Sequence, residues 1–427
     1  MKKTGNKRHR IRELRFAILA DAHIGRSIPL AIAEHRRRAF NVAFTKAVDA
    51  IIEAGVDYVF LCGDLFERRT LRPHLVQFAH DELYRLAEQT ESRHGRRVKI
   101  LIIRGNHDGR PQSDTLDYIK HPLADYLHAF DDDEITYSDE RLTVVGLSYY
   151  DEIERAFDQL ARPALEGAQG TKVIMLHAFV RGYNDVPPYS GSVTLDQLAS
   201  VDPAFVVTGH FHRRCRPRRL PNGGWIITPG SLEMYDFAED PDKGLYIVDA
   251  DGDEPVFTWV PIEPMHHMKK VDVRSERRRP PAWYGDAING EVESFIKELR
   301  ESGKEGYLRV RVDGGLSEGF PSDIPLDAVE KLRTEEPLLL YVDVDTMNLE
   351  PPPMAVRPQR DRVDVLEFFS GFGEFAEQIR EMHVRVGEVL EEDASVQTGL
   401  LTPTRRAPLV SEWVKRLEEH GFREGEG

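Results

Sequence analysis

Five short apolar runs of this chain each end in residue types that commonly bind metal ions. The segments read FAILADAH, YVFLCGD, VKILIIRGNHD, VIMLH and FVVTGHFH. The polar residues at their ends are Asp21, His23, Asp64, Asn106, His107, Asp108, His177, His210 and His212. Loops beyond the carboxyl ends of strands in an open α/β sheet converge on one crevice, so we expect these side chains to lie together. One histidine after a strand is usually structural, but five runs that end in this way favour a functional site.

These residue types indicate a transition-metal centre. Imidazoles, carboxylates and one amide oxygen suit Mn²⁺, Fe or Zn²⁺, whereas a Mg²⁺ or Ca²⁺ site would use oxygen ligands only. Seven ligands are too many for one ion, so we expect two ions roughly 3.5–4 Å apart that share a carboxylate. Such a pair can stabilise the attacking and the leaving oxygen of a phosphoryl displacement. The remaining histidines, including His35, His266 and His267, are interpreted as structural.

Strand and helix patterns alternate through the first 260 residues. Apolar residues between Phe40 and Ile52 recur three or four positions apart, which predicts an amphipathic helix with Gly55 as its C-terminal cap. Short apolar runs predict buried strands at Phe16–Ala20, Tyr58–Cys62, Val98–Ile103, Leu142–Leu147, Lys172–Leu176, Phe205–Thr208 and Trp225–Thr228. Strands interleaved with helices predict an α/β fold with substantial parallel pairing.

Two proline-rich stretches, RRRPPAW at 277–283 and LEPPPMAVRPQR at 349–360, predict domain boundaries. They divide the chain into residues 1–265, 281–350 and 351–427. The middle part is predicted to be a small α/β domain, with strands near Tyr307–Val312 and Leu338–Val344 and a helix near Ile324–Leu332. The last part is predicted to be helical and carries many large apolar side chains. These side chains either pack on the catalytic domain or bind a partner.

Composition sets the broad class of protein. The net charge is −16, but it is unevenly distributed. Residues 281–427 hold 17 basic and 31 acidic groups, whereas residues 1–280 hold 40 basic and 42 acidic groups. The first two thirds are therefore nearly neutral, and nucleic-acid binding is not excluded. The sequence lacks an apolar run long enough for a membrane span, and no apolar stretch follows the charged N-terminus. The two cysteines, Cys62 and Cys215, fit a reducing cytoplasm and are assigned no catalytic role.

The ordered motifs DAH, GD, GNHD, LH and GHFH resemble the motif series of the calcineurin-like metallophosphoesterases over about residues 14–250. The resemblance implies a β-sandwich flanked by helices. It also implies that one ion is bound by Asp21, His23, Asp64 and His212, and the other by Asp64, Asn106, His177 and His210. Asp64 would then bridge the two ions. His107 resembles the general acid of the family, and Asp108 is expected to orient it.

Three further segments resemble the SbcD-type nucleases of the meiotic-recombination-eleven family. They are GDLFE at 63–67, TPGSLEMYDFAED at 228–240 and KGLYIVD at 243–249. The resemblance implies Mn²⁺-dependent 3′→5′ exonuclease and single-strand endonuclease activity on DNA ends in double-strand-break repair, with attack by a metal-bridging hydroxide. Fe and Zn²⁺ are alternatives to the two Mn²⁺ ions. Many members carry histidine after GDLF, where this chain has Glu67. The contribution of that histidine to exonuclease activity therefore does not carry over to this chain.

The same resemblance implies partners and a location. Residues 281–350 resemble the DNA-capping domain of that family, and the helical C-terminal part resembles the segment that binds a coiled-coil ABC-type ATPase of the SbcC kind. A homodimer through helices near 72–90 and 112–128 is expected, in the cytoplasm and associated with the nucleoid, without a membrane.

A dense basic run follows directly after His212. Its members are Arg213, Arg214, Arg216, Arg218 and Arg219. Beside a metal centre these residues predict contacts to a DNA backbone; the alternative is a solvated charged face. Two other functions remain open. One is a phosphatase or phosphodiesterase for a substrate other than DNA, and the other is a non-catalytic scaffold that kept the fold.

Overall fold

The structure is a computed structural model that describes residues 14–70, 72–108, 118–119, 126–252 and 254–352, together with 411 and 415. The chain divides after Pro352, and the part before that residue is described below. The predicted C-terminal segment lies almost entirely outside the described residues.

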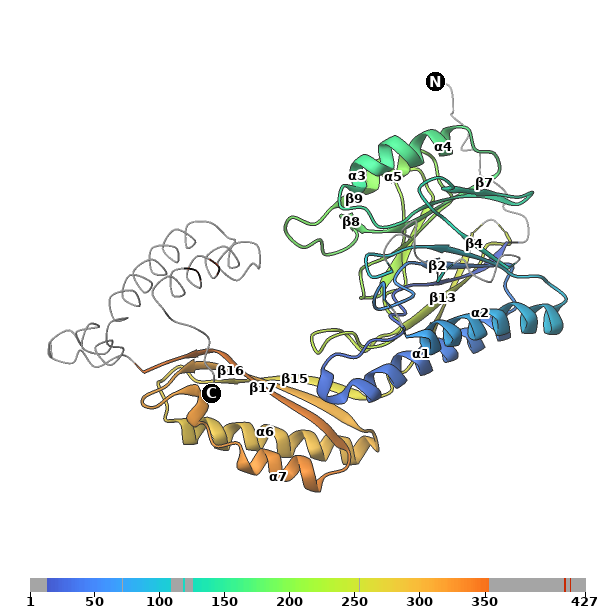
Figure 1. Cartoon of the computed structure of the whole chain (residues 1–427). Helices are drawn as coiled ribbons and strands as arrows, with labels where there is room; N and C mark the ends of the chain where they lie inside the picture. Colours follow the sequence, from blue (N-terminus) through green and yellow to red (C-terminus); the bar gives the residue numbers. More distant parts are fainter. Residues whose placement is uncertain are drawn as a thin grey trace. The chain divides into compact units, whose positions relative to one another are not determined.

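The first of two large sheets has the strand order β14-β13-β1-β2-β3-β4 (Figure 1). Its strands are β1 (Arg15–Leu19), β2 (Tyr58–Cys62), β3 (Lys99–Ile103), β4 (Leu127–Ala129), β13 (Gly244–Asp249) and β14 (Val256–Pro261). Strands β1 to β4 are parallel, whereas β13 pairs antiparallel with both β1 and β14. The predicted strands at Tyr58–Cys62 and near Phe16 and Ile103 are therefore confirmed.

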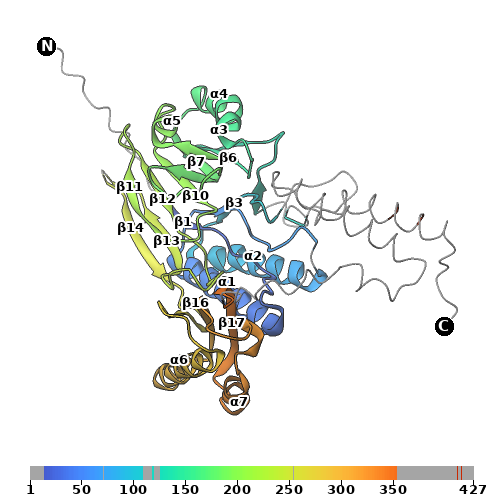
Figure 2. The same cartoon turned by 90° about the vertical axis from the view of Figure 1, so that its left-hand side faces the viewer.

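The second sheet has the order β11-β12-β10-β7-β6-β5 (Figure 2). Its strands are β5 (Thr136–Ser138), β6 (Leu142–Leu147), β7 (Thr171–His177), β10 (Phe205–Gly209), β11 (Cys215–Arg219) and β12 (Trp225–Thr228). The four central strands are parallel and the two edge strands are antiparallel. The expected parallel pairing is thus present in both sheets.

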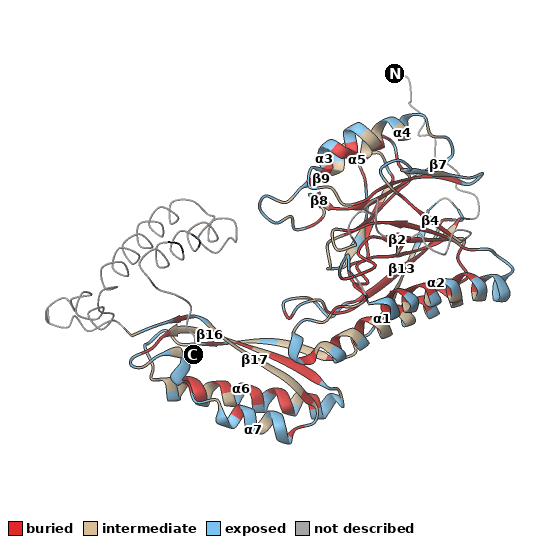
Figure 3. Cartoon of the chain, viewed as in Figure 1, coloured by how far each residue is buried: buried red, intermediate tan, exposed pale blue. Residues whose placement is uncertain are grey.

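The two sheets pack face to face, with helices on both outer faces. Helices α1 (Ala33–Ala54) and α2 (Pro73–His94) pack on the first sheet. The second sheet is covered by α3 (Ile153–Ala156), a π-helical turn (Phe157–Ala161), α4 (Arg162–Glu166) and α5 (Leu195–Ala199). Between the sheets, the ring centroids of Phe60 and Phe205 each lie 5.1 Å from that of Phe16, in edge-to-face arrangements. Figure 3 shows the buried interior of the β-sandwich, as the resemblance implied.

Helix α1 follows the predicted apolar spacing and begins earlier than its apolar residues indicate. It ends at Gly55, whose φ of 62° is the left-handed conformation of a C-terminal cap. A Cβ atom on Gly55 would lie 2.7 Å from the ring of His94, so a larger residue does not fit there. The predicted cap is confirmed.

A third, three-stranded parallel sheet follows the sandwich. It consists of β15 (His267–Arg274), β16 (Gly306–Gly315) and β17 (Leu339–Glu350), with α6 (Pro281–Ser302) and α7 (Asp327–Glu335) packed on it. The predicted strand-helix-strand order after residue 306 is present. Strand β15 precedes residue 281, so this sheet includes residues that the predicted boundary left out. Figure 1 shows the two helices on one face of the sheet.

Short elements complete the described part: 3₁₀ turns at Leu30–Ile32 and Pro321–Asp323 and the strand pair β8 (Phe179–Arg181) and β9 (Ser192–Thr194). Of the two helices proposed for a homodimer, the one near 72–90 corresponds to α2. The other is predicted near 112–128. Most of that range lies outside the described residues, and Leu127 begins strand β4. Among the described residues, no helix has the length and apolar character needed to cross a membrane.

Candidate active site

The predicted metal ligands follow the carboxyl ends of parallel strands from both sheets. Asp21 and His23 follow β1, Asp64 follows β2, and Asn106 follows β3. From the second sheet, His177 ends β7, while His210 and His212 follow β10. The structure therefore brings together residues that lie up to 191 positions apart in the sequence, at one edge of the sandwich.

The backbone at this edge is unusual. Four of the predicted ligands have positive φ angles without being glycine: 53° at Asp21, 44° at His23, 51° at Asp64 and 80° at His210. Each such conformation costs about 1–3 kcal/mol, and residues of this kind cluster at functional sites. Neighbouring Gly105 leaves room for a carboxylate, since a Cβ atom there would lie 2.0 Å from Asp64 Oδ1. The surrounding fold therefore stabilises strained backbone conformations that place the predicted ligands at this edge.

The side chains form two clusters with Asp64 between them. The ligand atoms of Asp21, His23 and His212 lie within 4.8 Å of one another, as do those of Asp64, His177 and His210. Asp64 Oδ2 is 3.3 Å from His177 Nε2 and 3.8 Å from His23 Nε2.

Further short approaches fit a pair of bound cations. The Nε2 atoms of His23 and His212 face one another at 3.2 Å, and Asn106 Oδ1 lies 3.2 Å from His177 Nε2. Imidazole nitrogens, carboxylates and one amide oxygen are a suitable donor set for two divalent transition-metal ions.

An oxygen atom lies behind each of three histidine rings, and in two cases it accepts a hydrogen bond from the ring. Nδ1 of His177 donates to the carbonyl of Cys62 at 2.8 Å, and Nδ1 of His212 donates to Glu239 Oε1 at 2.8 Å. Nδ1 of His23 lies 3.1 Å from Glu67 Oε2. Partners of this kind fix the ring so that Nε2 points to the metal site. Glu239 had no role in the sequence interpretation, although it lies in the segment 228–240 that carried the resemblance.

Burial and neighbouring charges shift the pKa values of several groups in the site. Burial and the nearby His177 lower the pKa of His210 to about 3, so its imidazole is neutral and can bind a metal. Burial acts against ionisation of Glu239, but His212 and Lys243 outweigh it and lower the pKa of the carboxyl group to about 2. Lys243 Nζ lies 2.7 Å from this carboxylate. A charged carboxylate behind His212 makes the ring a stronger ligand.

His107 lies at the rim of the clusters, with a side chain that is 30% exposed. Its backbone N–H donates to Asp64 Oδ1 at 2.8 Å, and its Nδ1 donates to the carbonyl of Glu67 at 2.9 Å. Nε2 is left as the atom that can exchange a proton with a substrate. The prediction that Asp108 orients this ring needs correction, because the Asp108 carboxylate accepts from the backbone N–H groups of Phe66 and Gly105 instead.

Glu67, which follows the GDLF segment, is 4% exposed, and its carboxylate lies next to His23 on the side away from the ligand clusters. Its Oε1 accepts from Arg26 Nη1 at 2.7 Å, while its Oε2 faces His23. The Arg26 guanidinium in turn lies 3.5 Å above the ring of Tyr235. Glu67 therefore links a metal-facing histidine to a buried cation.

We expect Glu67→Gln to weaken metal binding by about 10–100-fold, because the carboxylate that fixes and polarises His23 is lost. Isothermal titration of the metal-free protein with Mn²⁺ measures this change without an activity assay. The matched control is Glu34→Gln, an exposed residue of α1 whose carboxylate pairs with Arg37. Unchanged affinity in Glu67→Gln would show that His23 does not need this carboxylate.

The five arginines after His212 differ in their contacts with the rest of the protein. Strand β11, which contains most of it, is an edge strand of the second sheet. Arg214 pairs with Asp242 at 2.9 Å and lies 4.1 Å above Trp259, and Arg219 pairs with Glu254 and stacks on Trp225. These two residues connect the run to other segments. Arg213 and Arg218 have weaker ties, to Asp185 at 3.4 Å and to the Gly182 carbonyl at 2.6 Å. Arg213, Arg216, Arg218 and Arg219 are exposed.

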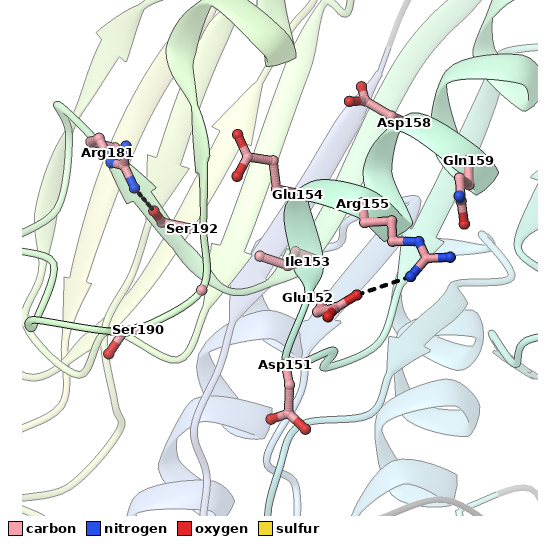
Figure 4. A pocket seen from close by; sticks show the side chains of 11 residues that line it. Asp151, Glu152, Ile153, Glu154, Arg155, Asp158, Gln159, Arg181, Ser190 and Ser192 are labelled. Carbon is pink, nitrogen blue, oxygen red and sulfur yellow. Dashed lines mark hydrogen bonds and ion pairs between the residues drawn. The ribbon is translucent and has the colours of Figure 1, made fainter.

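A separate hollow of about 640 Å³ lies between α3 and the loop before β9 (Figure 4). Its lining includes the acidic residues Asp151, Glu152, Glu154 and Asp158, with Arg155 and Arg181 as basic residues. Arg181 donates to Ser192 at 3.1 Å, and Arg155 pairs with Glu152 at 3.3 Å. None of the predicted ligands lines this hollow, and its excess of carboxylates does not favour a phosphate group.

Comparison with known proteins gives matches over this part of the chain. Residues 14–214 match the family model of the calcineurin-like phosphoesterases. The chain is 24% identical to a DNA double-strand break repair protein Mre11 from Methanopyrus kandleri, over 62% of this chain and 60% of that protein. It is 23% identical to the Mre11 protein of Archaeoglobus fulgidus, over 69% of this chain and 67% of that protein. It is also 23% identical to the uncharacterized metallophosphoesterase YhaO of Bacillus subtilis, over 79% of this chain and 83% of that protein.

Proposed function

Residues 14–214 of this chain form a calcineurin-like phosphoesterase domain, and from that premise we propose that the chain is a Mn²⁺-dependent DNA nuclease. The observation that carries the proposal is the pair of ligand clusters at the strand ends, with Asp64 in one cluster and 3.8 Å from His23 of the other. Similarity to two Mre11 proteins supports DNA as the substrate. The chain spans 60% of the Methanopyrus kandleri protein, so the activity of that whole protein is part of the proposal.

In this proposal, Asp21, His23, Asp64 and His212 hold one ion. Asp64, Asn106, His177 and His210 hold the other. The bound ions would supply Lewis-acid stabilisation of the negative charge that develops on the phosphate.

The protein's own groups complete the reaction. With Nδ1 bound to the carbonyl of Glu67, the ring of His107 presents Nε2 to the departing 3′ oxygen and donates a proton to it. A water oxygen forms the new bond to phosphorus as the bond to the 3′ oxygen breaks, which leaves a 5′-phosphate on the released fragment. The carboxylates of Glu67 and Glu239 keep His23 and His212 in position during the reaction.

The DNA backbone is proposed to pass Arg213, Arg216 and Arg218. We expect the triple Gln variant to bind single-stranded DNA more weakly, because fewer phosphate groups are neutralised and fewer counterions are released. Its log–log salt slope should be less steep by about 0.7 for each phosphate group that an arginine no longer neutralises. Fluorescence anisotropy at several salt concentrations measures both quantities, and hydrolysis of a small bis-ester should stay unchanged.

The control variant replaces Arg214 and Arg219 by Gln. It should lower the melting temperature, because both residues pair with carboxylates from other segments of the chain. It should leave the salt slope unchanged. Equal losses on DNA and on the small ester in the triple variant would contradict the proposed DNA path.

A second candidate is a phosphatase or phosphodiesterase that acts on a substrate other than DNA. The long match to YhaO and the glutamate at position 67 favour it. A panel of labelled single-stranded DNA, p-nitrophenyl phosphate and bis-p-nitrophenyl phosphate distinguishes the candidates. A nuclease should cleave DNA and the bis-ester, and a monoesterase only p-nitrophenyl phosphate.

Partners remain part of the proposal. Residues 281–350 are proposed to cap DNA, α2 to take part in a homodimer, and residues 361–427 to bind a coiled-coil ABC-type ATPase of the SbcC kind. The last segment lies almost wholly outside the described residues, and its spacing of apolar side chains supports the proposal. Deleting residues 361–427 should abolish co-purification with that ATPase while Mn²⁺-dependent hydrolysis is retained; loss of metal binding would contradict this.

A further inference from the structure

A second group of possible metal ligands lies outside the active site. It consists of His35, near the start of α1, His266, directly before β15, and Glu305, directly before β16. Strands β15 and β16 are parallel with His267 opposite Gly306, and the His267 N–H donates to the Glu305 carbonyl at 2.9 Å. This register places His266 beside Glu305. The fold thus brings together two histidines that the sequence interpretation treated as structural.

The distances within this group suit a bound ion. One ligand atom of each residue lies within 4.8 Å of the others, and His266 Nε2 is 3.6 Å from Glu305 Oε2. The ring centroids of His35 and His266 are 5.9 Å apart. The separation of 3.6 Å between His266 and Glu305 is close to that between two ligands of one tetrahedral zinc, for which Zn–N and Zn–O bonds are roughly 2.0–2.2 Å.

The state of His266 is an independent observation that points to a ligand. The residue is 3% exposed, and neither of its ring nitrogens has a hydrogen-bond partner among the described residues. Buried polar groups are nearly always satisfied, and an unsatisfied one costs about 1–3 kcal/mol. A metal ion or an ordered water must therefore complete the environment of this ring.

We infer that His35, His266 and Glu305 form a second metal site for an ion of the Zn²⁺ class. Two imidazoles and one carboxylate are a recognised zinc donor set that leaves one position for water. The Glu305 side chain is 46% exposed, so the site has access to solvent on that side. This site is independent of the phosphoesterase centre and of its proposed substrate.

Nearby positive charge is the main opposing factor. Burial lowers the pKa of His266, and the neighbouring His35, Arg36 and Arg38 act in the same direction. The Arg36 guanidinium is held elsewhere, with Nη2 donating to the Met234 carbonyl at 2.5 Å and Nε to the Ile28 carbonyl at 3.1 Å. Glu305 supplies the negative charge for the ion.

An ion at this site would connect separate parts of the fold. Helix α1 packs on the first sheet of the sandwich, whereas β15 and β16 belong to the three-stranded sheet. A bond from the ion to each of these elements would stabilise the native state, since the unfolded chain does not hold the three ligands together. Zn²⁺ should accordingly raise the melting temperature of the full chain.

The test counts ions in the full-length protein. Chelator-treated protein is dialysed against Zn²⁺ and analysed by mass spectrometry of bound metal, as wild type and as His266→Gln, Glu305→Gln and His267→Gln. The first two variants should hold about one ion fewer per chain than wild type. His267→Gln is the matched control, because its ring packs on Phe295 and is not part of the group. Its metal content should equal that of wild type.

Two further measurements separate this site from the active site and from misfolding. In an Asp64→Asn background, which disturbs the active site, the additional ion should remain and should be lost with Glu305→Gln. Glu305 is partly exposed, so its substitution keeps the test valid even if His266→Gln does not fold. Equal metal content in wild type, His266→Gln and Glu305→Gln would overturn the inference and leave an ordered water as the partner of His266. Failure of DNA cleavage alone would not affect it.

Discussion

Replacing Asp64 by alanine is expected to abolish metal binding at both clusters and to reduce phosphodiester hydrolysis by roughly 10³-fold or more. The carboxylate lies 3.3 Å from His177 and 3.8 Å from His23, so it faces both clusters. Its Oδ1 also accepts the backbone N–H of His107. Metal ions supply several kcal/mol of charge stabilisation, and each 1.36 kcal/mol is a factor of ten in rate.

Metal content by mass spectrometry and the rate on bis-p-nitrophenyl phosphate measure the two effects. Asp49→Ala serves as the control, because Asp49 is an exposed carboxylate of α1 that pairs with Arg85 at 2.6 Å. Its metal content and rate should match wild type. Asp64→Ala protein that still holds close to two ions per chain would rule out a shared carboxylate.

The second large effect is expected for His107→Asn. Removal of a positioned general acid costs about 10²–10⁴-fold in rate. No metal ligand is lost in the proposed arrangement, so the metal content should remain that of wild type. The combination of a low rate with full metal content distinguishes this variant from Asp64→Ala, in which both fall.

Rates on DNA and metal content should be measured on the same preparations. His94→Asn is a suitable control, because His94 Nε2 binds the carbonyl of Ile52 at 2.7 Å and supports the end of α2. A near-normal rate for His107→Asn would exclude a role as the acid. Loss of metal in this variant would instead make His107 a ligand, as its place in a group with His23 and Asp64 allows.

The strands and the residues at their ends could be predicted because each depends on a short stretch of sequence. A buried parallel strand is continuously apolar, and the polar residue after it marks the sheet edge where loops converge. Tyr58–Cys62 followed by Asp64 is a clear example. The order of strands within each sheet was not predicted, since it depends on pairing between distant segments.

The residues behind the ligands could not be found from the sequence for the same reason. Glu239 is 27 positions from His212, and no local pattern connects them. Asp108 is adjacent to His107, and that adjacency suggested a contact, but its carboxylate turns to the backbone of the loop after β2. Neighbours in the chain are not always neighbours in space, because side chains separate where the backbone turns sharply.

The arginine run shows a further limit. Five basic residues close together predict a basic surface, yet the partners of Arg214 and Arg219 come from other parts of the chain. The same limit applies to His35 and His266, which are separated by 231 positions and become neighbours only through the fold. Local composition identifies charge and ligand types but not which of them are already paired.

The most direct test of the proposed function is a cleavage assay on end-labelled single-stranded DNA with metal-free full-length protein. We predict no cleavage without added metal, and fragments with 5′-phosphate ends when Mn²⁺ is supplied. His107→Asn protein in the same assay should bind Mn²⁺ but produce almost no fragments. DNA that stays intact with Mn²⁺, while the same preparation hydrolyses p-nitrophenyl phosphate, would contradict a nuclease and identify the chain as a phosphatase of the same family.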